Sequence, residues 1–402
     1  MRRIRENIIS LMLFVFDTIL FVPVIIAAIV ARFVHKRYDV GIGPEPLINN
    51  VYHKKALERY GYTAKTFVGE TYFITSEFDV RTDSVFRPPF SEILRYYLYF
   101  YSIFNFKCLY IYFNGGPLFF TSYLWRLEPL LYRIAKVKVV IMPYGSDIQD
   151  MLRCPNLVFR DAVCSDYPDH RLKRNRIQKK IDLWTKYADH IIGGCDWVDY
   201  LYHWDTLLLA HFAIDIPDFH SSVINTQNEA DFGGRSIRIL HAPNHKKIKG
   251  TKFVLDAIRE LQEEGYDIDF VLVEKRPNAE VRRIIQTADL VIDQLIIGWY
   301  AMFAIEAMAS GKPVICYLRD DLINLYTVNG LIKPSEIPII NSNPLRIKDD
   351  IRYWIRNRND LQDIGRRSRE YVIKHHSLDY VGGVFDNINR SLGITPTNQD
   401  TH

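Results

Sequence analysis

Residues 298–315 read GWYAMFAIEAMASGKPVI, and this stretch decides the fold class of the chain. Its middle part, 301–309, is apolar except for Glu306, which predicts a helix that is buried on nearly every side. Gly311 and Pro313 end the helix, and the apolar run that follows predicts a buried strand. Since an unpaired buried charge is very unfavourable, we expect Glu306 to meet a hydrogen-bonding partner or a ligand, unless it lies at an exposed end of the helix.

The start of the same helix is a second candidate binding feature. Gly298, Trp299 and Tyr300 precede the apolar run. Backbone N–H groups at a helix start attract anions such as a diphosphate, so we expect these residues to help bind one.

Outward from this stretch, short apolar runs alternate with amphipathic segments. The second half has expected strands at 236–240, 269–273, 290–294 and 313–317, and expected helices at 252–263, 279–287 and 300–309. The first half has expected strands at 66–68, 109–113, 138–142 and 190–192, and expected helices at 49–60, 119–134 and 174–187. This alternation indicates α/β domains with parallel sheets.

The polar, turn-rich stretch 217–234 separates the two series and predicts a linker. The expected segments are a membrane anchor helix (1–37), a first Rossmann-like domain (38–220), a linker (221–234), a second Rossmann-like domain (235–376), and a C-terminal helix and tail (377–402). A cleft between two such domains is the usual place for a small-molecule site.

The N-terminus predicts association with a membrane. Residues 8–31 carry a single charged side chain, Asp17, and are flanked by basic residues on both sides. The length suits one bilayer crossing and exceeds the apolar region of a signal peptide. Asp17 would be costly at mid-membrane and Pro23 interrupts a helix, so a monotopic or re-entrant helix is the alternative.

Residues 90–125 are rich in aromatic side chains, which form either a large core with its strands or an interfacial belt against the membrane.

Composition excludes several classes of protein. The net charge of +4 over 402 residues is small, and no nucleic-acid recognition module is present, so we expect no nucleic-acid partner. Five irregularly spaced cysteines argue against a disulfide framework and a zinc site. Phosphate loops of the P-loop and dinucleotide types are missing, and the D-x-D at 267–269 precedes a strand instead of following one.

The segment Glu306-Ala-Met-Ala-Ser-Gly311-Lys-Pro313-Val-Ile resembles the donor-site signature E-A-x-A-x-G-x-P-V of glycosyltransferase family 4 and its GT-B relatives. The similarity extends over 241–317, and more weakly to 144–147, 187–189 and 213–217. It implies a GT-B fold, in which two Rossmann-like domains face each other across a cleft. By this resemblance, 38–220 would be the acceptor-side domain and 235–376 the nucleotide-sugar-binding domain. In that family this glutamate hydrogen-bonds the ribose of a nucleotide-sugar, and the resemblance implies that role for Glu306.

The chain departs from the family at one position. The family places a second glutamate before the first, as E-x7-E, and this chain has Gly298 there. That glutamate approaches the donor sugar in the family. Asp293 or Gln294, at the end of the preceding strand, could take over the contact.

The loop at 241–250, HAPNHKKIKG, is the expected diphosphate site. It follows a strand and precedes a helix, where backbone amides and lysine charge can hold phosphate. The resemblance matches Lys249 to the family's lysine and places Asn244 where the family has an arginine, so Lys246 or Lys247 would supply the second charge. The other interpretation is a solvated basic turn. Glu274 and Arg276 follow the next strand and could contact base or phosphate.

On the acceptor side, glycine-containing loops lie at the carboxyl ends of strands, where open α/β sheets bind ligands. They contain the candidate acceptor-side residues Gly41, Gly43, Asn114, Gly115 and Gly116. Asp147 follows a strand and could serve as general base, or else cap the following helix. Asp147 and Glu306 are therefore the two candidate catalytic carboxylates.

Together these features predict transfer of a sugar from a nucleotide-diphosphate donor to a lipid-linked or polysaccharide acceptor. The protein would be membrane-anchored with its catalytic domains in the cytoplasm, where nucleotide-sugars occur. No cofactor or metal is implied, because lysines and a helix start can balance the leaving diphosphate. The alternatives are a nucleotide-sugar epimerase or hydrolase of the same fold, and an inactive membrane scaffold, which Gly298 would favour.

Overall fold

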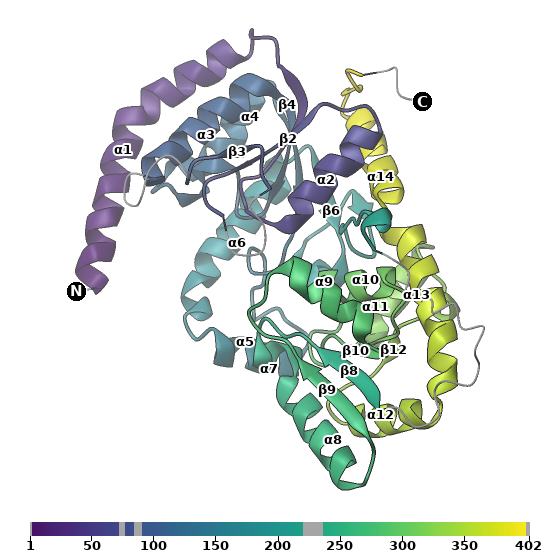
Figure 1. The fold of residues 1–402 in the computed structure, drawn as a ribbon. Helices are drawn as coiled ribbons and strands as arrows, with labels where there is room; N and C mark the ends of the chain where they lie inside the picture. The colour runs from purple at the N-terminus through teal and green to yellow at the C-terminus, as the bar shows by residue number, and fades with distance from the viewer. Residues whose placement is uncertain (1, 72–76, 84–90, 220–235, 399–402) are drawn as a thin grey trace.

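The computed structural model describes residues 2–71, 77–83, 91–219 and 236–398. Within them the chain forms two α/β lobes, each built on a parallel sheet (Figure 1). This confirms the predicted fold class. The expected linker at 221–234 lies outside the described residues.

The first lobe contains, in its described part, a seven-stranded sheet of order β3-β2-β1-β4-β5-β6-β7, with every pair parallel. Its strands are β1 (Tyr38–Ile42), β2 (Ala64–Val68), β3 (Val80–Arg81), β4 (Phe106–Tyr112), β5 (Lys138–Met142), β6 (His190–Gly193) and β7 (Thr206–Leu207). A parallel sheet covered on both faces needs continuous apolar strands, and β4 and β5 are buried along nearly their whole length.

The strand β1 corrects the sequence analysis, which placed a loop at Gly41. Gly41 lies inside the strand, because the Phe106 ring of β4 fills the space beside it and a Cβ there would lie 2.5 Å from Cδ2 of that ring. Its glycine therefore reflects packing within the sheet.

The second lobe contains, among the described residues, a five-stranded parallel sheet of order β12-β11-β10-β8-β9. Its strands are β8 (Ile237–His241), β9 (Ile268–Leu272), β10 (Leu290–Ile292), β11 (Val314–Cys316) and β12 (Ile340–Asn341). The expected strands match the first four within two residues. The short β12 was not predicted.

Helices cover both sheets, and short 3-10 turns connect them. The α-helices of the first half are α1 (Arg2–Ala31), α2 (Ile48–Arg59), α3 (Ser91–Asn105), α4 (Glu128–Ile134), α5 (Leu157–Asp166) and α6 (His170–Tyr187). Those of the second half are α7 (Lys246–Lys249), α8 (Thr251–Glu263), α9 (Asn278–Thr287), α10 (Met302–Ala309), α11 (Asp320–Val328), α12 (Ile347–Arg356), α13 (Leu361–His376) and α14 (Leu378–Ser391). The 3-10 turns are η1 (Pro117–Phe120), η2 (Leu124–Arg126), η3 (Cys195–Tyr200), η4 (Ile216–Asp218), η5 (Pro334–Glu336) and η6 (Arg358–Asp360).

The last helix returns to the first lobe. The Ser377 side chain caps α14 by accepting a hydrogen bond from Tyr380 N, and α14 then packs on α2. Gly382 permits this close approach, since a Cβ there would lie 2.6 Å from the Ala56 carbonyl oxygen. The C-terminal helix therefore packs against a helix of the first lobe.

The aromatic segment corrects the expected local structure. Residues 91–105 form the helix α3, and the predicted long helix at 119–134 is two 3-10 turns followed by the short α4. The core interpretation is confirmed for most of the rings. Tyr96 and Tyr99 of α3 and Tyr110 and Tyr112 of β4 are buried.

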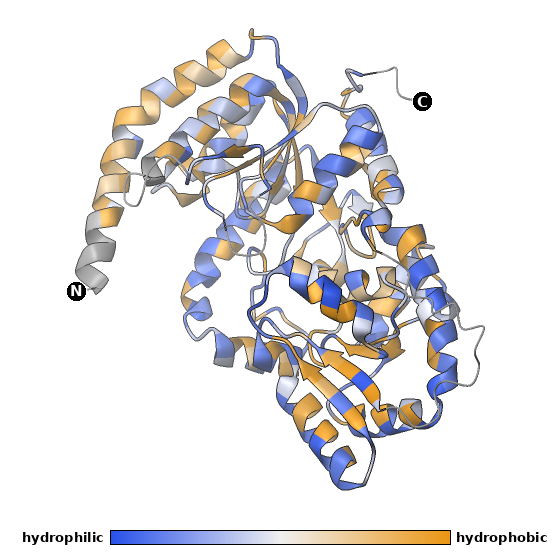
Figure 2. Cartoon of the chain, in the orientation of Figure 1, coloured by the Kyte–Doolittle hydropathy of each residue, from blue (hydrophilic) through white to orange (hydrophobic). Residues whose placement is uncertain are grey.

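Among the described residues, one helix is long and apolar enough to cross a membrane, over Ile9–Ala31 of α1. Figure 2 shows α1 as a mostly hydrophobic helix along the outside of the first lobe. It packs against α3 and α4 and contains Pro23 within its length.

Candidate active site

The expected diphosphate loop lies at the carboxyl edge of the second sheet. Lys249 ends α7, and its Nζ forms an ion pair with Asp293 Oδ1 at the end of β10. Asp293 is buried, and its Oδ2 has no hydrogen-bond partner in the described part of the chain. The structure thus brings together two of the predicted donor-site residues, a lysine and a carboxylate with one unused oxygen.

Gln294, the neighbouring candidate, is engaged in holding the loop that follows it. Its Oε1 accepts hydrogen bonds from Ile296 N at 2.9 Å and Ile297 N at 2.6 Å. Its Nε2 donates to the carbonyl oxygen of Trp299 at 2.8 Å. Because both ends of the amide are occupied, Asp293 is the better candidate for a sugar contact.

Glu306 lies buried in α10, as the sequence predicted. Asn278 Nδ2 donates to both carboxylate oxygens, at 2.9 and 3.1 Å, and Arg282 Nε lies 3.5 Å away. Burial raises the pKa of Glu306, and Arg282 and Asn278 oppose that shift. Both partners come from α9, so the carboxylate faces the start of α9, beside the loop that contains Glu274 and Arg276.

The remaining loop candidates lie on the surface. Asn244 and Lys247 are exposed, and Lys246 Nζ pairs with Glu274 Oε1 at 2.8 Å. Arg276 is exposed and pairs with Glu280 at 3.4 Å. These side chains can move toward a ligand at little cost, because exposed ion pairs contribute little to stability.

At the expected anion site, the side chains of Trp299 and Tyr300 are engaged within the protein. The helix α10 begins at Met302, and both aromatic side chains are buried between the lobes. Trp299 Nε1 donates to the carbonyl oxygen of Leu209 at 2.8 Å. Tyr300 OH lies 3.0 Å from His376 Nε2. Trp299 therefore links the second lobe to the first, whereas Tyr300 contacts α13 of its own lobe.

Gly298 has a structural reason to be glycine. Its φ of +106° favours glycine, and a Cβ there would lie 2.5 Å from Arg319 Cδ. Arg319 pairs with Asp199 of the first lobe and with Asp321. The E-x7-E pattern has a glutamate at this position. Here the aliphatic part of the Arg319 side chain fills the space that a side chain at residue 298 would need, and the same arginine links the lobes.

Asp147, the candidate base of the first lobe, binds backbone amides. Its Oδ2 accepts from Phe113 N at 3.0 Å, and its Oδ1 accepts from Gly145 N at 2.9 Å and Tyr144 N at 3.1 Å. No helix begins directly after it, so the helix-capping alternative is wrong. Burial raises its pKa to about 7. The side chain fixes the turns after β4 and β5.

A cluster that the sequence analysis missed lies at the same edge. Asn114 Nδ2 donates to Glu45 Oε1 at 2.6 Å and to Tyr144 OH at 2.7 Å, and Lys180 Nζ donates to Asn114 Oδ1 at 3.2 Å. Burial raises the pKa of Glu45 and lowers that of Lys180 to about 7. The sequence feature that could have identified Glu45 is the segment Gly41-Ile-Gly-Pro-Glu45, which places a carboxylate shortly after the strand β1.

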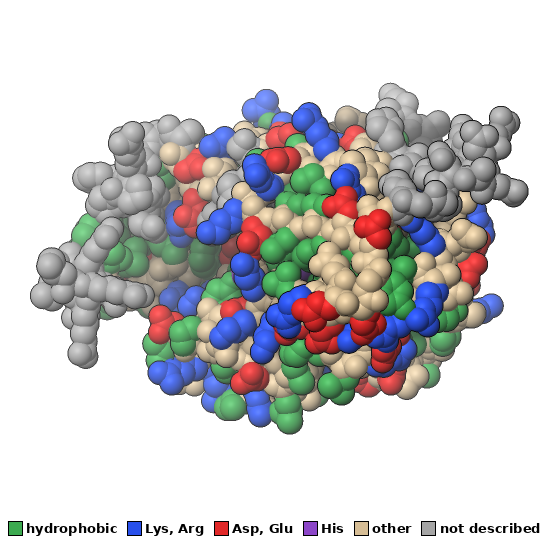
Figure 3. Space-filling model, turned by 60° about the horizontal axis from the view of Figure 1, so that its bottom comes forward, with side chains coloured by type: hydrophobic (Ala, Val, Ile, Leu, Met, Phe, Trp, Pro, Cys, Tyr) green, Lys and Arg blue, Asp and Glu red, His purple; other side chains and the backbone are tan. Residues whose placement is uncertain are grey.

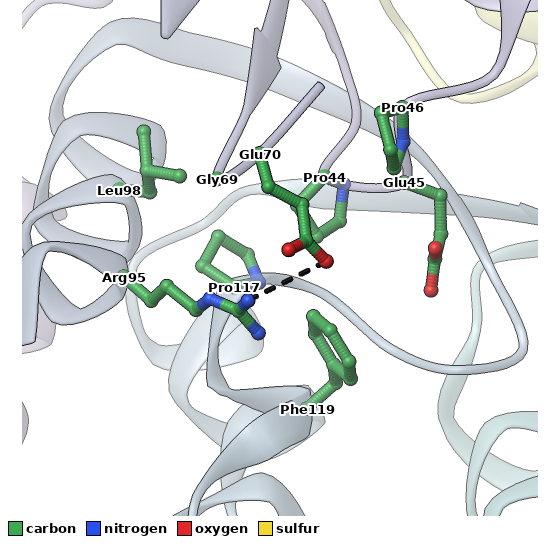
Figure 4. Close-up of a pocket in the computed structure, with 9 residues that line it drawn as sticks. All are labelled: Pro44, Glu45, Pro46, Gly69, Glu70, Arg95, Leu98, Pro117 and Phe119. Carbon is green, nitrogen blue, oxygen red and sulfur yellow. Dashed lines mark ion pairs between the residues drawn. The ribbon is translucent and has the colours of Figure 1, made fainter. Parts of the chain in front are cut away.

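Glu45 also lines a narrow pocket (Figure 4). Arg95 and Glu70 reach toward each other across it, 3.6 Å apart, and Phe119 lies beside the guanidinium. The volume of about 20 Å³ is close to that of a single water site.

The other acceptor-side glycines are packed against the chain itself. A Cβ on Gly43 would lie 2.1 Å from Phe67 O, and one on Gly116 would lie 2.2 Å from Tyr132 OH. Gly115 and Gly116 follow β4, and Glu128 holds this turn by accepting from Gly116 N at 3.0 Å. Among the predicted residues of this edge, Asn114 alone presents a side chain to the cluster.

Figure 3 shows the underside of the molecule, where basic and acidic side chains are interspersed. This face presents no broad field of one sign, such as a nucleic-acid-binding surface has.

The arrangement of two parallel sheets with a C-terminal helix returning to the first lobe is the GT-B fold. Solved structures confirm this at the level of fold. Sucrose-phosphate synthase from Thermosynechococcus elongatus matches 89% of this chain and 99% of its own, with a TM-score of 0.58 and 12% identity.

Anabaena HepE, solved with UDP-glucose, matches 89% of this chain and 100% of its own, with a TM-score of 0.55 and 11% identity. An alpha-glucosyltransferase solved with UDP and DNA matches 88% of this chain and 99% of its own, with a TM-score of 0.52 and 10% identity. No family model matches the sequence, and no curated protein matches it.

Proposed function

We propose that this chain is a membrane-associated glycosyltransferase that moves a sugar from a nucleotide-diphosphate donor to an acceptor hydroxyl. The observation that carries the proposal is the pair of carboxylates on the second lobe, Glu306 and Asp293. Each is buried, and each is paired with a cation at the edge where α/β sheets bind ligands.

The second lobe would hold the donor. Glu306, next to Asn278, suits a ribose, because a carboxylate accepts hydrogen bonds from two neighbouring hydroxyls. Lys249 suits the diphosphate, and the exposed Lys246 and Lys247 lie on the same short helix. HepE and the alpha-glucosyltransferase were solved with UDP-glucose and UDP, which supports this assignment.

The first lobe would hold the acceptor. In the transfer, the bond from C1 of the sugar to the diphosphate breaks, and a bond from the acceptor oxygen to C1 forms. The acceptor proton passes to Glu45, whose raised pKa suits a general base better than an ordinary carboxylate. Lys249 stabilises the negative charge on the departing diphosphate, and the proposal involves no metal.

Membrane association rests on α1, whose described part exposes large apolar side chains such as Leu11, Phe14 and Ile19. The helix packs on α3 and α4 of the acceptor lobe. An acceptor in or on the membrane would therefore meet the lobe that we assign to it.

The test combines nucleotide release with one matched pair of variants. UDP- and GDP-sugars are incubated with the full-length protein, with and without membrane lipid. Release only with lipid supports transfer, release without lipid indicates hydrolysis or epimerisation, and binding without release indicates a scaffold. Glu306→Gln should lower donor affinity about tenfold, which is about 1.4 kcal/mol. Glu263→Gln on the exposed face of α8 is the control. Unchanged donor affinity in Glu306→Gln would remove Glu306 from the site.

A further inference from the structure

The helix α1 is fastened along the surface of the first lobe. Asp17, in its middle, is fully buried and accepts hydrogen bonds from Tyr96 OH at 2.6 Å and Tyr123 N at 2.7 Å. At its end, Lys36 Nζ donates to the carbonyl oxygen of Ala31 at 2.6 Å and also to that of Ile103, the latter in α3. The lobe therefore covers one side of the helix from its middle to its end.

The opposite side of α1 is apolar and uncovered. Its side chains include Leu11, Ile19, Val22 and Ile26, with exposed fractions of 65, 62, 57 and 54%. A helix that crossed the bilayer would carry the attached lobe, with its charged residues, into the hydrocarbon, which is costly. A helix lying in the plane of the interface buries the apolar side in lipid and leaves the lobe in water.

A hollow of about 350 Å³ opens between this helix and the lobe. It is lined by Ile9, Ser10 and Leu13 of α1, by Phe120, Thr121 and Ser122 of the loop from η1 to η2, and by Arg176 of α6. One wall is thus apolar and continuous with the membrane-facing helix, and the other carries hydroxyls and a guanidinium. This combination matches an amphiphile with an anionic head.

Two guanidinium groups lie close together at the hollow, and no carboxylate among the described side chains pairs with them. Arg176 and Arg126 both lie over the Trp125 ring, 5.8 and 4.7 Å from its centroid. Neither forms an ion pair with a carboxylate in the described part of the chain. Arg176 donates to the carbonyl oxygen of Phe119 at 2.6 Å, which points the guanidinium at the loop that lines the hollow. Two neighbouring guanidiniums without an acidic partner favour an anion between or beside them.

We propose that this hollow binds the phosphate group of a membrane lipid, with Arg176 and Arg126 on the phosphate and Ile9 and Leu13 along the hydrocarbon. The α1 helix lies in the plane of the membrane. The inference rests on the proposed function for its membrane setting, and it names the chemistry of the lipid that this lobe engages.

The test measures binding of the full-length protein to vesicles of phosphatidylcholine, with and without phosphatidic acid, by flotation. Phosphatidic acid should tighten binding, and the double change Arg126→Gln with Arg176→Gln should lower that gain about tenfold. Arg171→Gln is the control, because it removes one positive charge from the helix that carries Arg176, but at a residue that lines a different hollow, against α5. A second arm adds inorganic phosphate to the phosphatidic acid vesicles.

Each outcome of the flotation experiment supports or overturns the proposed lipid-phosphate site. A gain from phosphatidic acid that is lost in the double variant, kept in Arg171→Gln and insensitive to inorganic phosphate supports the site. Equal binding by the double variant and the wild type would overturn it, and displacement by inorganic phosphate would show a free-anion site in its place. Affinity for UDP and GDP, measured in the same variants, should not change. If the lipid experiment fails while UDP or GDP still binds, the proposed function stands. If the wild-type protein binds neither nucleotide, that function is refuted independently of the lipid site.

Discussion

Replacing Gly298 by alanine tests why this chain departs from the E-x7-E pattern. The new Cβ would lie 2.5 Å from Cδ and 2.6 Å from Cγ of Arg319, closer than real contacts allow. Backbone cannot relieve the clash easily, because Arg319 N donates to the carbonyl oxygen of Gly298 at 2.9 Å. The arginine stem must therefore move away from Asp199.

The loss of stability has two parts. A non-glycine residue at a φ of +106° costs about 1–2 kcal/mol. Displacing Arg319, whose side chain is 8% exposed, weakens its pair with Asp199, which is 12% exposed. Breaking a buried ion pair costs about 3–5 kcal/mol, and a shift is milder than a deletion, so we expect a further loss of about 2 kcal/mol. The total is about 3–4 kcal/mol.

Urea unfolding of the detergent-solubilised protein measures this free energy, with Gly265→Ala as control. Gly265 has a φ of +92° and nothing within 4 Å of its would-be Cβ, so its replacement should cost only the backbone part. In an Arg319→Ala background the cost of Gly298→Ala should fall to that same value, because the clash is gone. Equal losses of stability for Gly298→Ala and Gly265→Ala would refute the steric explanation. The space beside position 298 would then be free for a ligand.

Two further predictions concern the chemistry. Lys249→Ala should weaken binding of UDP about tenfold and leave binding of uridine unchanged, as calorimetry can show, with the exposed Lys252→Ala as control; equal losses for both ligands would count against a phosphate role. Burial raises the pKa of Glu45, so the acid limb of the pH–rate profile should lie above pH 4.5, where activity is lost as the pH falls and the base is protonated. Glu45→Gln should abolish that limb along with most of the activity, and an unchanged profile would exclude Glu45 as the base.

The fold was largely readable from the sequence, because the strands of parallel sheets are apolar runs that need no partner to be recognised. The strand β1 could not be recognised in this way. Its Gly41 looked like a loop residue until the Phe106 ring, far along the chain, was seen beside it. The helix α3 was not predicted either, because aromatic residues have an intrinsic preference for strands.

The residues of the candidate site could be proposed one by one from the sequence, but their arrangement could not. Glu306 and Lys249 were proposed from local patterns, whereas the pairing of Lys249 with Asp293 depends on the order of β8 and β10 in the sheet. Glu45 was missed because its role depends on Asn114 and Lys180, which arrive from other strands and helices. Trp299 and Tyr300 were also proposed as binding residues, and the structure buries both side chains: Trp299 contacts Leu209 of the first lobe, and Tyr300 contacts His376 of α13.

The helix α1 shows how a single charge can carry more information than the hydropathy around it. Asp17 would be costly in a spanning helix, yet its neighbours in the sequence are apolar, so no polar face marks the side that meets protein. That side is marked by spacing. The fully buried residues Asp17, Val24, Ala28 and Ala31 recur at intervals of three, four and seven, as one stripe of a helix does, and two of them are alanine. Small residues let another helix approach closely, and a carboxylate in the same stripe requires donors on that neighbour. A charge in register with small residues therefore indicates a helix that lies against protein, with lipid left to the other face.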